Sequence, residues 1–320
     1  MLNRIKNLKD FLSLFIDIKW VYRDLRGKLE LELFPQIDRL SSNSENDILK
    51  KRMKRMAFYV PVSCLQYSNL CGVNMDYKQF KALSIIGAIH PIYDSFFDEG
   101  GVREIDLKFM DRLLDGENYI PKNEREEMLL SLYRELVDEL NPEDNQRFYD
   151  VLAKLHKSQI ESLAMKDDVN AGTLKNISYD KGGNALLLYA LIVNPHMSER
   201  EYKIVYDFGA WLQIFDDMED AIEDKRNGIK TLITEGLLSE RDIEREKNRV
   251  FGEIAQLEYP EKKKRDFLFA QYCIYIRGMF FKKIYDLYQK NKESSIGKVK
   301  TFLKCMDLAS KYSYRDYNNS

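Results

Sequence analysis

The sequence predicts an all-α protein, a single-domain bundle of helices. Its 320 residues include only 15 glycines and seven prolines, and most of these lie between periodic segments. No run of alternating apolar and polar residues is followed by a hairpin signal, so strands are not expected. No internal repeat and no Pro/Ser-rich linker divides the chain. We therefore expect one helical domain over residues 1–320.

Capping residues mark where several of the predicted helices begin. Asn141, followed by a proline and two acids, combines a side-chain cap with a proline at the first helical position. A capping box begins at Ser198, and Ser239 opens a similar pattern. The polar stretch 166–180 is expected to be a long surface loop. The helices that we expect cover residues 4–33, 46–73, 77–98, 103–115, 122–139, 142–166, 184–193, 199–225, 239–257, 261–291 and 295–316.

Composition and charge exclude several classes of protein. The chain has 50 lysines and arginines against 52 aspartates and glutamates, a net charge of −2, which argues against binding nucleic acid through a basic face. With 44% hydrophobic and 32% charged residues, an intrinsically disordered chain is excluded. The four cysteines form no CxxC pair, and we interpret them as reduced thiols of a cytoplasmic protein.

No segment has the length of a transmembrane helix. The longest obvious apolar run, residues 185–193, is far shorter than the roughly 20 residues that span a bilayer. The N-terminus has a basic start and an apolar middle, which Asp17 and Lys19 interrupt too early for a signal peptide. We interpret it as an amphipathic first helix, and peripheral contact with a membrane surface stays open as the alternative.

Carboxylates interrupt two otherwise apolar helices, and the first case lies in residues 84–100. Asp94 and Asp98 are four residues apart, so they share one helix face, which we call the first acidic row. Apolar residues precede them, and a Gly-Gly pair follows and ends the helix. His90 lies one turn before Asp94. We interpret it as a core histidine, and the alternative is that it orients the Asp94 carboxylate.

The second case contains three aspartates. Asp216, Asp220 and Asp224 are spaced by four, and a drift of about 40° per step keeps them on one face, which we call the second acidic row. Gln213 lies near this row one turn earlier, and Gly209 falls on the same face. A glycine inside a helix costs about 1 kcal/mol relative to alanine. We therefore expect that Gly209 leaves space for a ligand and, like Gln213, lines a cavity.

Both acidic rows break local rules of helix stability. Like charges one turn apart repel each other, and acids near a helix C-terminus oppose the helix dipole. Such conflicts are expected where function requires them. A divalent cation would relieve the repulsion, and oxygen ligands without cysteine or clustered histidine favour Mg²⁺ over zinc. Because Mg²⁺ takes one or two carboxylates and completes its shell with water and phosphate oxygens, the rows predict a site for Mg²⁺ and a phosphorylated substrate.

Basic residues are candidates for binding a diphosphate. Lys181 precedes two glycines and an apolar run, where free backbone N–H groups at a helix start would bind phosphate oxygens. Lys225 and Arg226 follow the second acidic row and would close over the substrate. Arg277 lies in an apolar segment and needs an anionic partner. For each of them an ordinary structural role is the alternative interpretation.

Aromatic side chains lie close to both acidic rows in the sequence. Most of them belong to the core that a helical bundle requires. We expect a few of them, Phe97 included, to line a cavity in which aromatic faces stabilise a carbocation.

The two acidic rows together resemble the metal-binding motifs of class I isoprenoid synthases. The residues that carry the resemblance are Asp94, Asp98, Gln213, Asp216, Asp217, Asp220 and Asp224. Lys181 resembles the diphosphate-binding lysine of that superfamily, so the similarity covers roughly residues 85–232. The resemblance implies an α-helical isoprenoid-synthase fold, Mg²⁺ as cofactor with three ions on the diphosphate, and an allylic prenyl diphosphate as substrate.

The details of the two motifs bear on which branch of the superfamily the chain resembles. The first motif is DxxxD and not the DDxxD of most head-to-tail prenyltransferases, and no Arg-Arg pair follows it. The second motif departs from the pattern of bacterial cyclases, because it has aspartate at three positions where they commonly place asparagine, serine or threonine, and glutamate. The second motif, three aspartates followed by a basic residue with Lys-Gly-Gly upstream, is similar to the motif of large-terpene cyclases of the tetraprenyl-β-curcumene synthase type.

The sequence leaves three functions open. The first is a class I terpene synthase, a lyase in which the acidic rows hold Mg²⁺, Lys181 stabilises the leaving diphosphate and the allylic cation cyclises in an apolar cavity. The second is a prenyltransferase that condenses two prenyl units. The third is a non-catalytic helical binding protein with acidic rows on its surface. No catalytic general base is identifiable, and a homodimer stays open.

Overall fold

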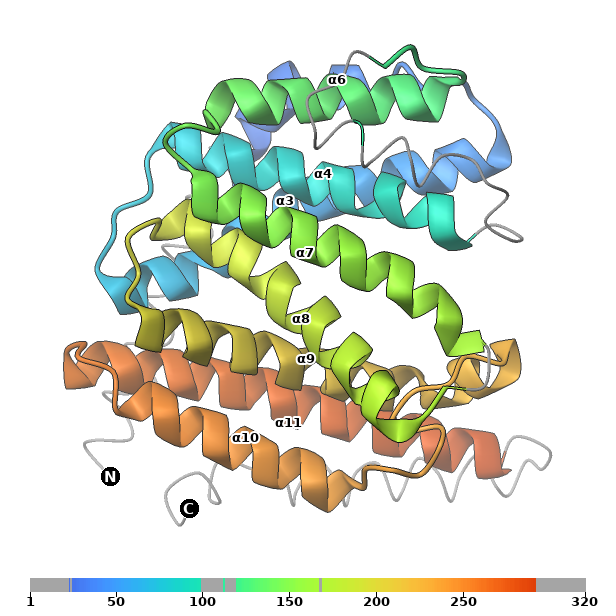
Figure 1. Cartoon of the computed structure of the whole chain (residues 1–320), viewed down its shortest axis with the longest axis vertical. Coiled ribbons are helices and arrows are strands. Elements are labelled where there is room, and N and C mark those ends of the chain that lie inside the picture. Colours follow the sequence, from blue (N-terminus) through green and yellow to red (C-terminus); the bar gives the residue numbers. More distant parts are fainter. Residues whose placement is uncertain (1–22, 24, 99–111, 113–118, 167–168, 292–320) are drawn as a thin grey trace.

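Helices are the regular elements of the structure, a computed structural model that describes residues 23, 25–98, 112, 119–166 and 169–291. Their bounds are Phe34–Ile37 (α2), Ser44–Cys71 (α3), Tyr77–Asp98 (α4), Glu124–Glu139 (α6), Gln146–Ser162 (α7), Leu163–Lys166 (η1, a 3₁₀ turn), Ala171–Val193 (α8), Glu199–Asn227 (α9), Glu240–Ala255 (α10) and Glu261–Asn291 (α11). No strand occurs in the described ranges, which confirms the all-α class. The helices are stacked in layers from α6 to α10 (Figure 1).

Many helix boundaries follow the local signals in the sequence. The expected helix 77–98 coincides with α4, and the capping box expected at Ser239 opens α10. The helix start expected at Asn141 is wrong, because the Asn141 side chain accepts a hydrogen bond from the Glu143 N–H within a turn, and α7 begins only at Gln146. Outside the described residues lie the helix expected at 295–316 and most of the helices expected at 103–115 and 4–33.

The largest departure from the expected helices concerns α8. The sequence predicts a loop over 166–180 and a helix start near residue 184, yet α8 begins at Ala171. The Asn170 side chain caps it by accepting a hydrogen bond from the Thr173 N–H. Lys181 and the two glycines after it therefore lie in the middle of a helix. Because only the first four N–H groups of a helix are free, the expected phosphate cradle at this position is wrong.

Two glycines let α8 and α9 approach each other closely. A Cβ atom built on Gly182 would lie 2.5 Å from the Gly209 carbonyl oxygen, and one built on Gly209 would lie 2.7 Å from Leu186 Cβ. This contact offsets the helix-weakening effect of glycine, which is about 1 kcal/mol per residue. The expectation that Gly209 leaves space for a ligand is wrong, because the neighbouring helix fills that space.

Gly209→Ala should destabilise the protein by about 1 to 3 kcal/mol, since the added methyl group would meet the backbone of α8. Gly252→Ala in α10 is the matched control. No described residue lies within 4 Å of its Cβ position, so alanine there should stabilise the protein by up to about 1 kcal/mol. Urea unfolding measures both changes. Equal effects of the two substitutions would contradict this account of the helix contact.

Helix α8 lies between the two helices that carry the acidic rows, since it contacts both α4 and α9. One hydrophobic cluster gathers around α3, α4, α6 and the C-terminal half of α8. A second gathers around α9, α10 and α11, where the buried Trp211 stacks against Phe208 and Phe215. Leu187 of α8 belongs to the first cluster and Ile177 of α8 to the second. The position of α8 between the clusters fixes the geometry of the site described below.

The described cysteines are free thiols, as the sequence predicts. They are Cys64, Cys71 and Cys273. Burial raises the pKa of Cys64 to about 12, so this thiol stays protonated and unreactive at neutral pH. None of the described helices combines the length and the apolar character needed to cross a membrane.

Candidate functional site

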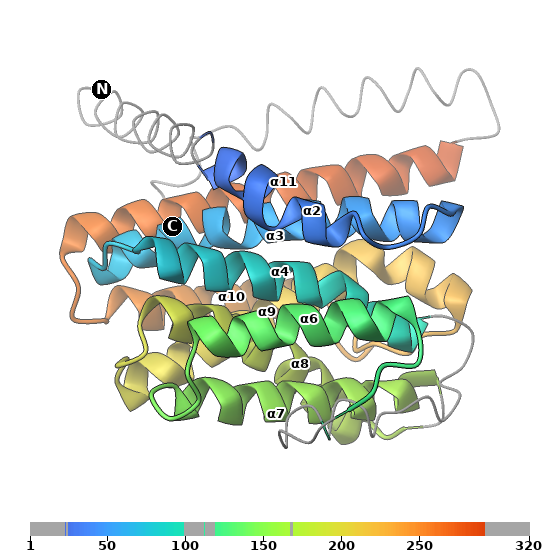
Figure 2. The ribbon, with the colours of Figure 1, turned by 90° about the horizontal axis from the view of Figure 1, so that it is seen from above.

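The two acidic rows lie at the same end of the helical bundle. Asp94 lies one turn before the end of α4, and the second acidic row occupies the C-terminal part of α9. Figures 1 and 2 show from two directions that the C-terminal ends of α4 and α9 are at the same end of the molecule. Asp98 is the final residue of α4, and its side chain lies outside the described residues.

His90 pairs with Asp94, with 3.1 Å between His90 Nε2 and Asp94 Oδ2. Burial disfavours the charged form of both groups, but their hydrogen bond and mutual attraction outweigh it, so the pKa of His90 is raised and that of Asp94 lowered. The charges of Lys181 and Arg52 lower the pKa of Asp94 further. The His90 side chain is 43% exposed, so the interpretation as a core histidine is wrong. Its contact favours the alternative, a histidine that orients Asp94.

The second acidic row is crowded with like charges. Asp216 and Asp220 are exposed, and Asp224 is half-buried. Lost hydration, followed by the charges of Asp220 and Asp216, raises the pKa of Asp224 to about 6. Lost hydration and the charge of Asp220 likewise raise the pKa of Asp216. The row is therefore destabilised by repulsion that a bound cation would relieve.

Lys181 connects the two rows electrostatically. It lies in the middle of α8, and its charge counteracts the effect of burial on the pKa of Asp94 from one side and of Asp216 from the other. It acts in the same way on Asp217 and Asp224. Within the described part of the chain Lys181 forms no close ion pair, so its ammonium group is not committed to one carboxylate. The expected diphosphate-binding lysine is thus placed between the rows, although its backbone surroundings differ from those expected.

Asp217 is a buried acid that the expected metal ligands do not include. It is 7% exposed, and Gln213 Nε2 donates a hydrogen bond to its Oδ1 at 2.8 Å. Its Oδ2 has no hydrogen-bond partner among the described residues. Burial, opposed by Gln213 and reinforced by the charge of Asp216, raises its pKa to about 7. The signal in the sequence is the adjacent pair of aspartates, because consecutive residues on a helix point about 100° apart, so Asp217 need not share the exposure of Asp216.

The pH dependence of stability should reveal Asp217. Its pKa is about 7 in the folded protein against a usual value of 3.8, so the folded state binds more protons between these values. The free energy of unfolding of the metal-free protein should therefore fall as the pH rises from about 4 to 7, by on the order of 3 kcal/mol from this group, and then level off. In Asp217→Asn the free energy of unfolding should no longer show this fall with rising pH, as measured by urea unfolding across this pH range.

The control for this measurement is Asp150→Asn, which changes an exposed aspartate of α7. It should keep the wild-type dependence of stability on pH. A wild-type slope in Asp217→Asn would contradict the raised pKa that we assign to Asp217.

Among the described side chains, Lys225 and Arg226 form no ion pair with the acidic rows, and the side chain of Arg277 is not described. Lys225 and Arg226 are exposed in the last turn of α9, where their charges complement the helix dipole. Neither forms an ion pair with another described residue. Arg277 lies in α11, and its side chain is outside the described residues. A role for these three in binding diphosphate stays a prediction.

The other residues expected to line a cavity have protein contacts of their own. Phe97 is 8% exposed, and its ring centroid lies 5.0 Å from that of Tyr93. Gln213 donates to Asp217, and a Cβ on Gly182 would meet the Gln213 Cβ. That Phe97 and Gln213 line a cavity stays a prediction, whereas Gly209 is explained by the packing of α8 on α9.

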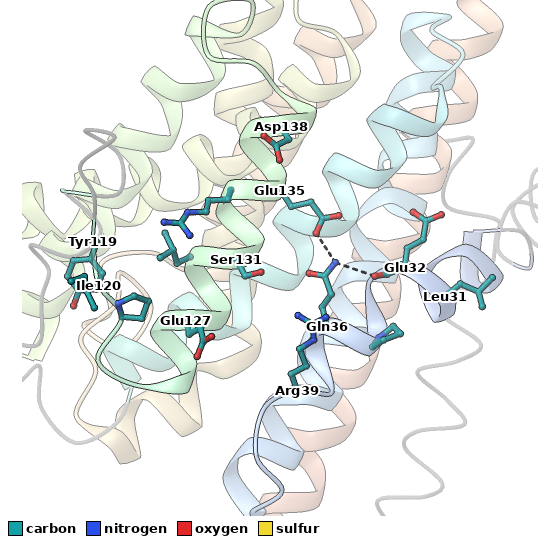
Figure 3. Close-up of a pocket in the computed structure, with 14 residues that line it drawn as sticks. Leu31, Glu32, Gln36, Arg39, Tyr119, Ile120, Glu127, Ser131, Glu135 and Asp138 are labelled. Atoms are coloured by element: carbon teal, nitrogen blue, oxygen red, sulfur yellow. Dashed lines mark hydrogen bonds between the residues drawn. The ribbon is translucent and has the colours of Figure 1, made fainter.

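A hollow of about 1060 Å³ opens elsewhere, between α6 and the segment around α2 (Figure 3). Across it Gln36 donates a hydrogen bond to Glu135 Oε2 at 2.9 Å. Its charged lining residues carry both signs: Glu32, Arg39, Glu127, Arg134, Glu135 and Asp138. None of its lining residues belongs to the acidic rows or to the expected diphosphate-binding set. We therefore treat it as separate from the candidate site.

The acidic groups at this end of the bundle fit Mg²⁺ together with a phosphate ligand. In the described ranges no three acidic, histidine or cysteine side chains form a metal centre by themselves. A cation here needs ligands from outside the protein, and Mg²⁺ usually combines one or two carboxylates with water and phosphate oxygens. Such a cation would stabilise Asp217 Oδ2, which has no hydrogen-bond partner among the described residues, and the mutually repelling Asp216 and Asp224.

Comparison with known proteins does not assign the chain to a family. No protein-family model matches the chain, and no match is found among curated proteins. The case for a function therefore rests on the residues of the candidate site and on their chemistry.

Proposed function

We propose that the protein is a class I terpene synthase with an isoprenoid-synthase fold. It would remove diphosphate from an allylic prenyl diphosphate with the help of Mg²⁺, and the carbocation would then cyclise and lose a proton, which the released diphosphate would accept. The observation that carries this proposal is the position of Lys181, on the helix between the acidic rows, where its charge acts on acids of both. A metal-bound diphosphate needs carboxylates for its cations and an ammonium group for its own oxygens, and this end of the bundle offers both.

The roles of the residues follow from their positions. Bound Mg²⁺ would withdraw charge from the diphosphate and make it a better leaving group. Asp94 would hold the cation from α4, and Asp216 would hold it from α9. Lys181 would bind diphosphate oxygens, and its charge favours the departing anion over the bound substrate. None of these roles requires the protein to supply a nucleophile.

Binding can be tested before any product is known. The melting temperature should rise when Mg²⁺ and inorganic diphosphate are added together, and change little with either alone, because each completes the other's coordination. At ligand concentrations of about 100 times Kd the stabilisation is about 2.7 kcal/mol. No shift with the combination would contradict the proposal and favour a non-catalytic helical protein.

Product analysis tests the reaction itself. Incubation with C10 to C25 prenyl diphosphates and Mg²⁺ should release diphosphate and form a cyclic hydrocarbon from a single substrate, as detected by gas chromatography–mass spectrometry. A product that requires isopentenyl diphosphate or a second prenyl acceptor would indicate a prenyltransferase instead. If the protein binds Mg²⁺ and diphosphate but turns over none of these substrates, the proposed binding site is supported and the proposed activity is contradicted.

A further inference from the structure

We propose that His90 and Tyr189 are positioning residues, which hold the Asp94 carboxylate in the orientation that binds Mg²⁺. This inference rests on the proposed function, because it concerns how one expected metal ligand is held. Three side chains carry it, and they connect α8 to α4. Tyr189 OH lies 3.4 Å from His90 Nδ1, and His90 Nε2 lies 3.1 Å from Asp94 Oδ2.

The contact with Tyr189 decides which atom of His90 faces the acid. Burial raises the pKa of the Tyr189 hydroxyl above its usual value, so the hydroxyl keeps its proton at neutral pH. When the imidazole is neutral, a hydroxyl that donates to Nδ1 leaves the ring proton on Nε2. When the imidazole is charged, both ring nitrogens carry protons, and the hydroxyl oxygen accepts from Nδ1. In both cases Nε2–H donates to Asp94.

The contact with His90 leaves one oxygen of Asp94 available. His90 takes Oδ2, and no described residue donates a hydrogen bond to Oδ1. The Asp94 side chain is 23% exposed, so a ligand from outside the protein can reach this carboxylate. A carboxylate held by one oxygen and free at the other is prepared to bind a cation through a single oxygen. Partners that fix a ligand in this way commonly change metal affinity by about 10- to 100-fold.

The anchor of this arrangement lies on a different helix from the acid. Tyr189 belongs to α8, the helix that also carries Lys181. The same helix therefore contributes one group that acts on Asp94 by its charge and another that acts through His90. Asp94 itself belongs to α4, so its orientation depends on how these two helices pack.

Calorimetric titration of Mg²⁺ in the presence of inorganic diphosphate tests this inference without turnover. His90→Ala should weaken the apparent affinity for Mg²⁺ about 10-fold or more. His90→Gln should recover part of this loss, because its amide N–H can donate to Asp94. Tyr189→Phe should lie between the wild type and His90→Ala, since it removes only the contact that orients the ring. His196→Gln, at an exposed histidine, is the matched control and should bind as the wild type does.

Turnover gives a second measurement that separates positioning from folding. In His90→Ala the Mg²⁺ concentration for half-maximal rate should rise about 10-fold, while the rate at saturating Mg²⁺ recovers towards that of the wild type. The melting temperature without ligand reports on the fold separately. Wild-type Mg²⁺ affinity in His90→Ala would overturn this inference and leave the proposed function standing. A wild-type protein that does not respond to Mg²⁺ and diphosphate would overturn both.

Discussion

Asp216→Asn should lower the rate of diphosphate release by about 100-fold or more, if the protein acts as proposed. Asparagine has the size of aspartate but lacks the charge that holds a divalent cation. The same substitution removes repulsion between Asp216 and Asp220, so the metal-free protein should become slightly more stable, by a few tenths of a kcal/mol. Kinetics of diphosphate release and urea unfolding, measured on the same preparation, separate the two effects.

The opposite directions of these two effects make the prediction specific. A general loss of folding would lower both activity and stability, whereas removal of a metal ligand lowers activity alone. Asp150→Asn on the exposed side of α7 should leave both unchanged. A rate for Asp216→Asn close to that of the wild type would show that this carboxylate does not hold the catalytic cation.

A buried carboxylate near the start of α9 joins the ends of several helices. Glu201 is 5% exposed, and its Oε1 accepts hydrogen bonds from the hydroxyls of Tyr67 at 2.7 Å and Tyr259 at 2.6 Å. Tyr67 belongs to α3, and Tyr259 lies between α10 and α11. The Ser198 hydroxyl accepts a hydrogen bond from the Glu201 N–H, which is one of the two bonds of the expected capping box. The other bond is not formed, because the Glu201 carboxylate contacts the tyrosines.

Glu201→Ala should destabilise the protein by about 3 to 5 kcal/mol. It leaves two half-buried hydroxyls without their acceptor, and a buried donor without a partner costs about 1 to 3 kcal/mol. The lost packing of the side chain adds to this cost. Burial is the main cause that raises the pKa of both tyrosines, so neither can relieve the loss by ionising at neutral pH. Urea unfolding at neutral pH measures the change.

Glu199→Ala is the matched control for Glu201, because it removes a glutamate two residues earlier in the same helix. Glu199 is 89% exposed, and its ion pair with Arg147 at 3.0 Å should contribute less than about 1 kcal/mol. The second acidic row begins 15 residues after Glu201, roughly 22 Å along the helix. The melting temperature of the folded Glu201→Ala protein should therefore still rise when Mg²⁺ and diphosphate are added. Similar losses of stability in the two variants would contradict the role of the buried carboxylate.

Helices with a clear apolar period and a side-chain cap are predictable from this sequence, as α4 and α10 illustrate. The failure at α8 has a physical reason. Two adjacent glycines and a polar stretch favour a loop locally, and a helix there gains its stability from contacts with other helices. Gly182 and Gly209 show this contact at close range, and the partner in each case lies far away in the sequence.

The candidate site also combines features that local sequence predicts with features that depend on helix packing. The two acidic rows are visible in the sequence because residues four apart share a helix face. The pairing of His90 with Asp94 is also a local relation, and exposure alone distinguishes it from a core histidine. The burial of Asp217 is not a local property, since it depends on which face of α9 the neighbouring helices cover.

Local patterns in the sequence are enough to predict the all-α class, most of the helices and the placement of five aspartates on two helix faces. These features follow from a period of 3.6 residues, which relates neighbours within one or two turns. Packing between helices places Lys181 in a helix between the rows and buries Asp217, whose Oδ2 has no hydrogen-bond partner among the described residues. Both depend on the fit between helix surfaces from distant parts of the chain, and no local periodicity encodes that fit.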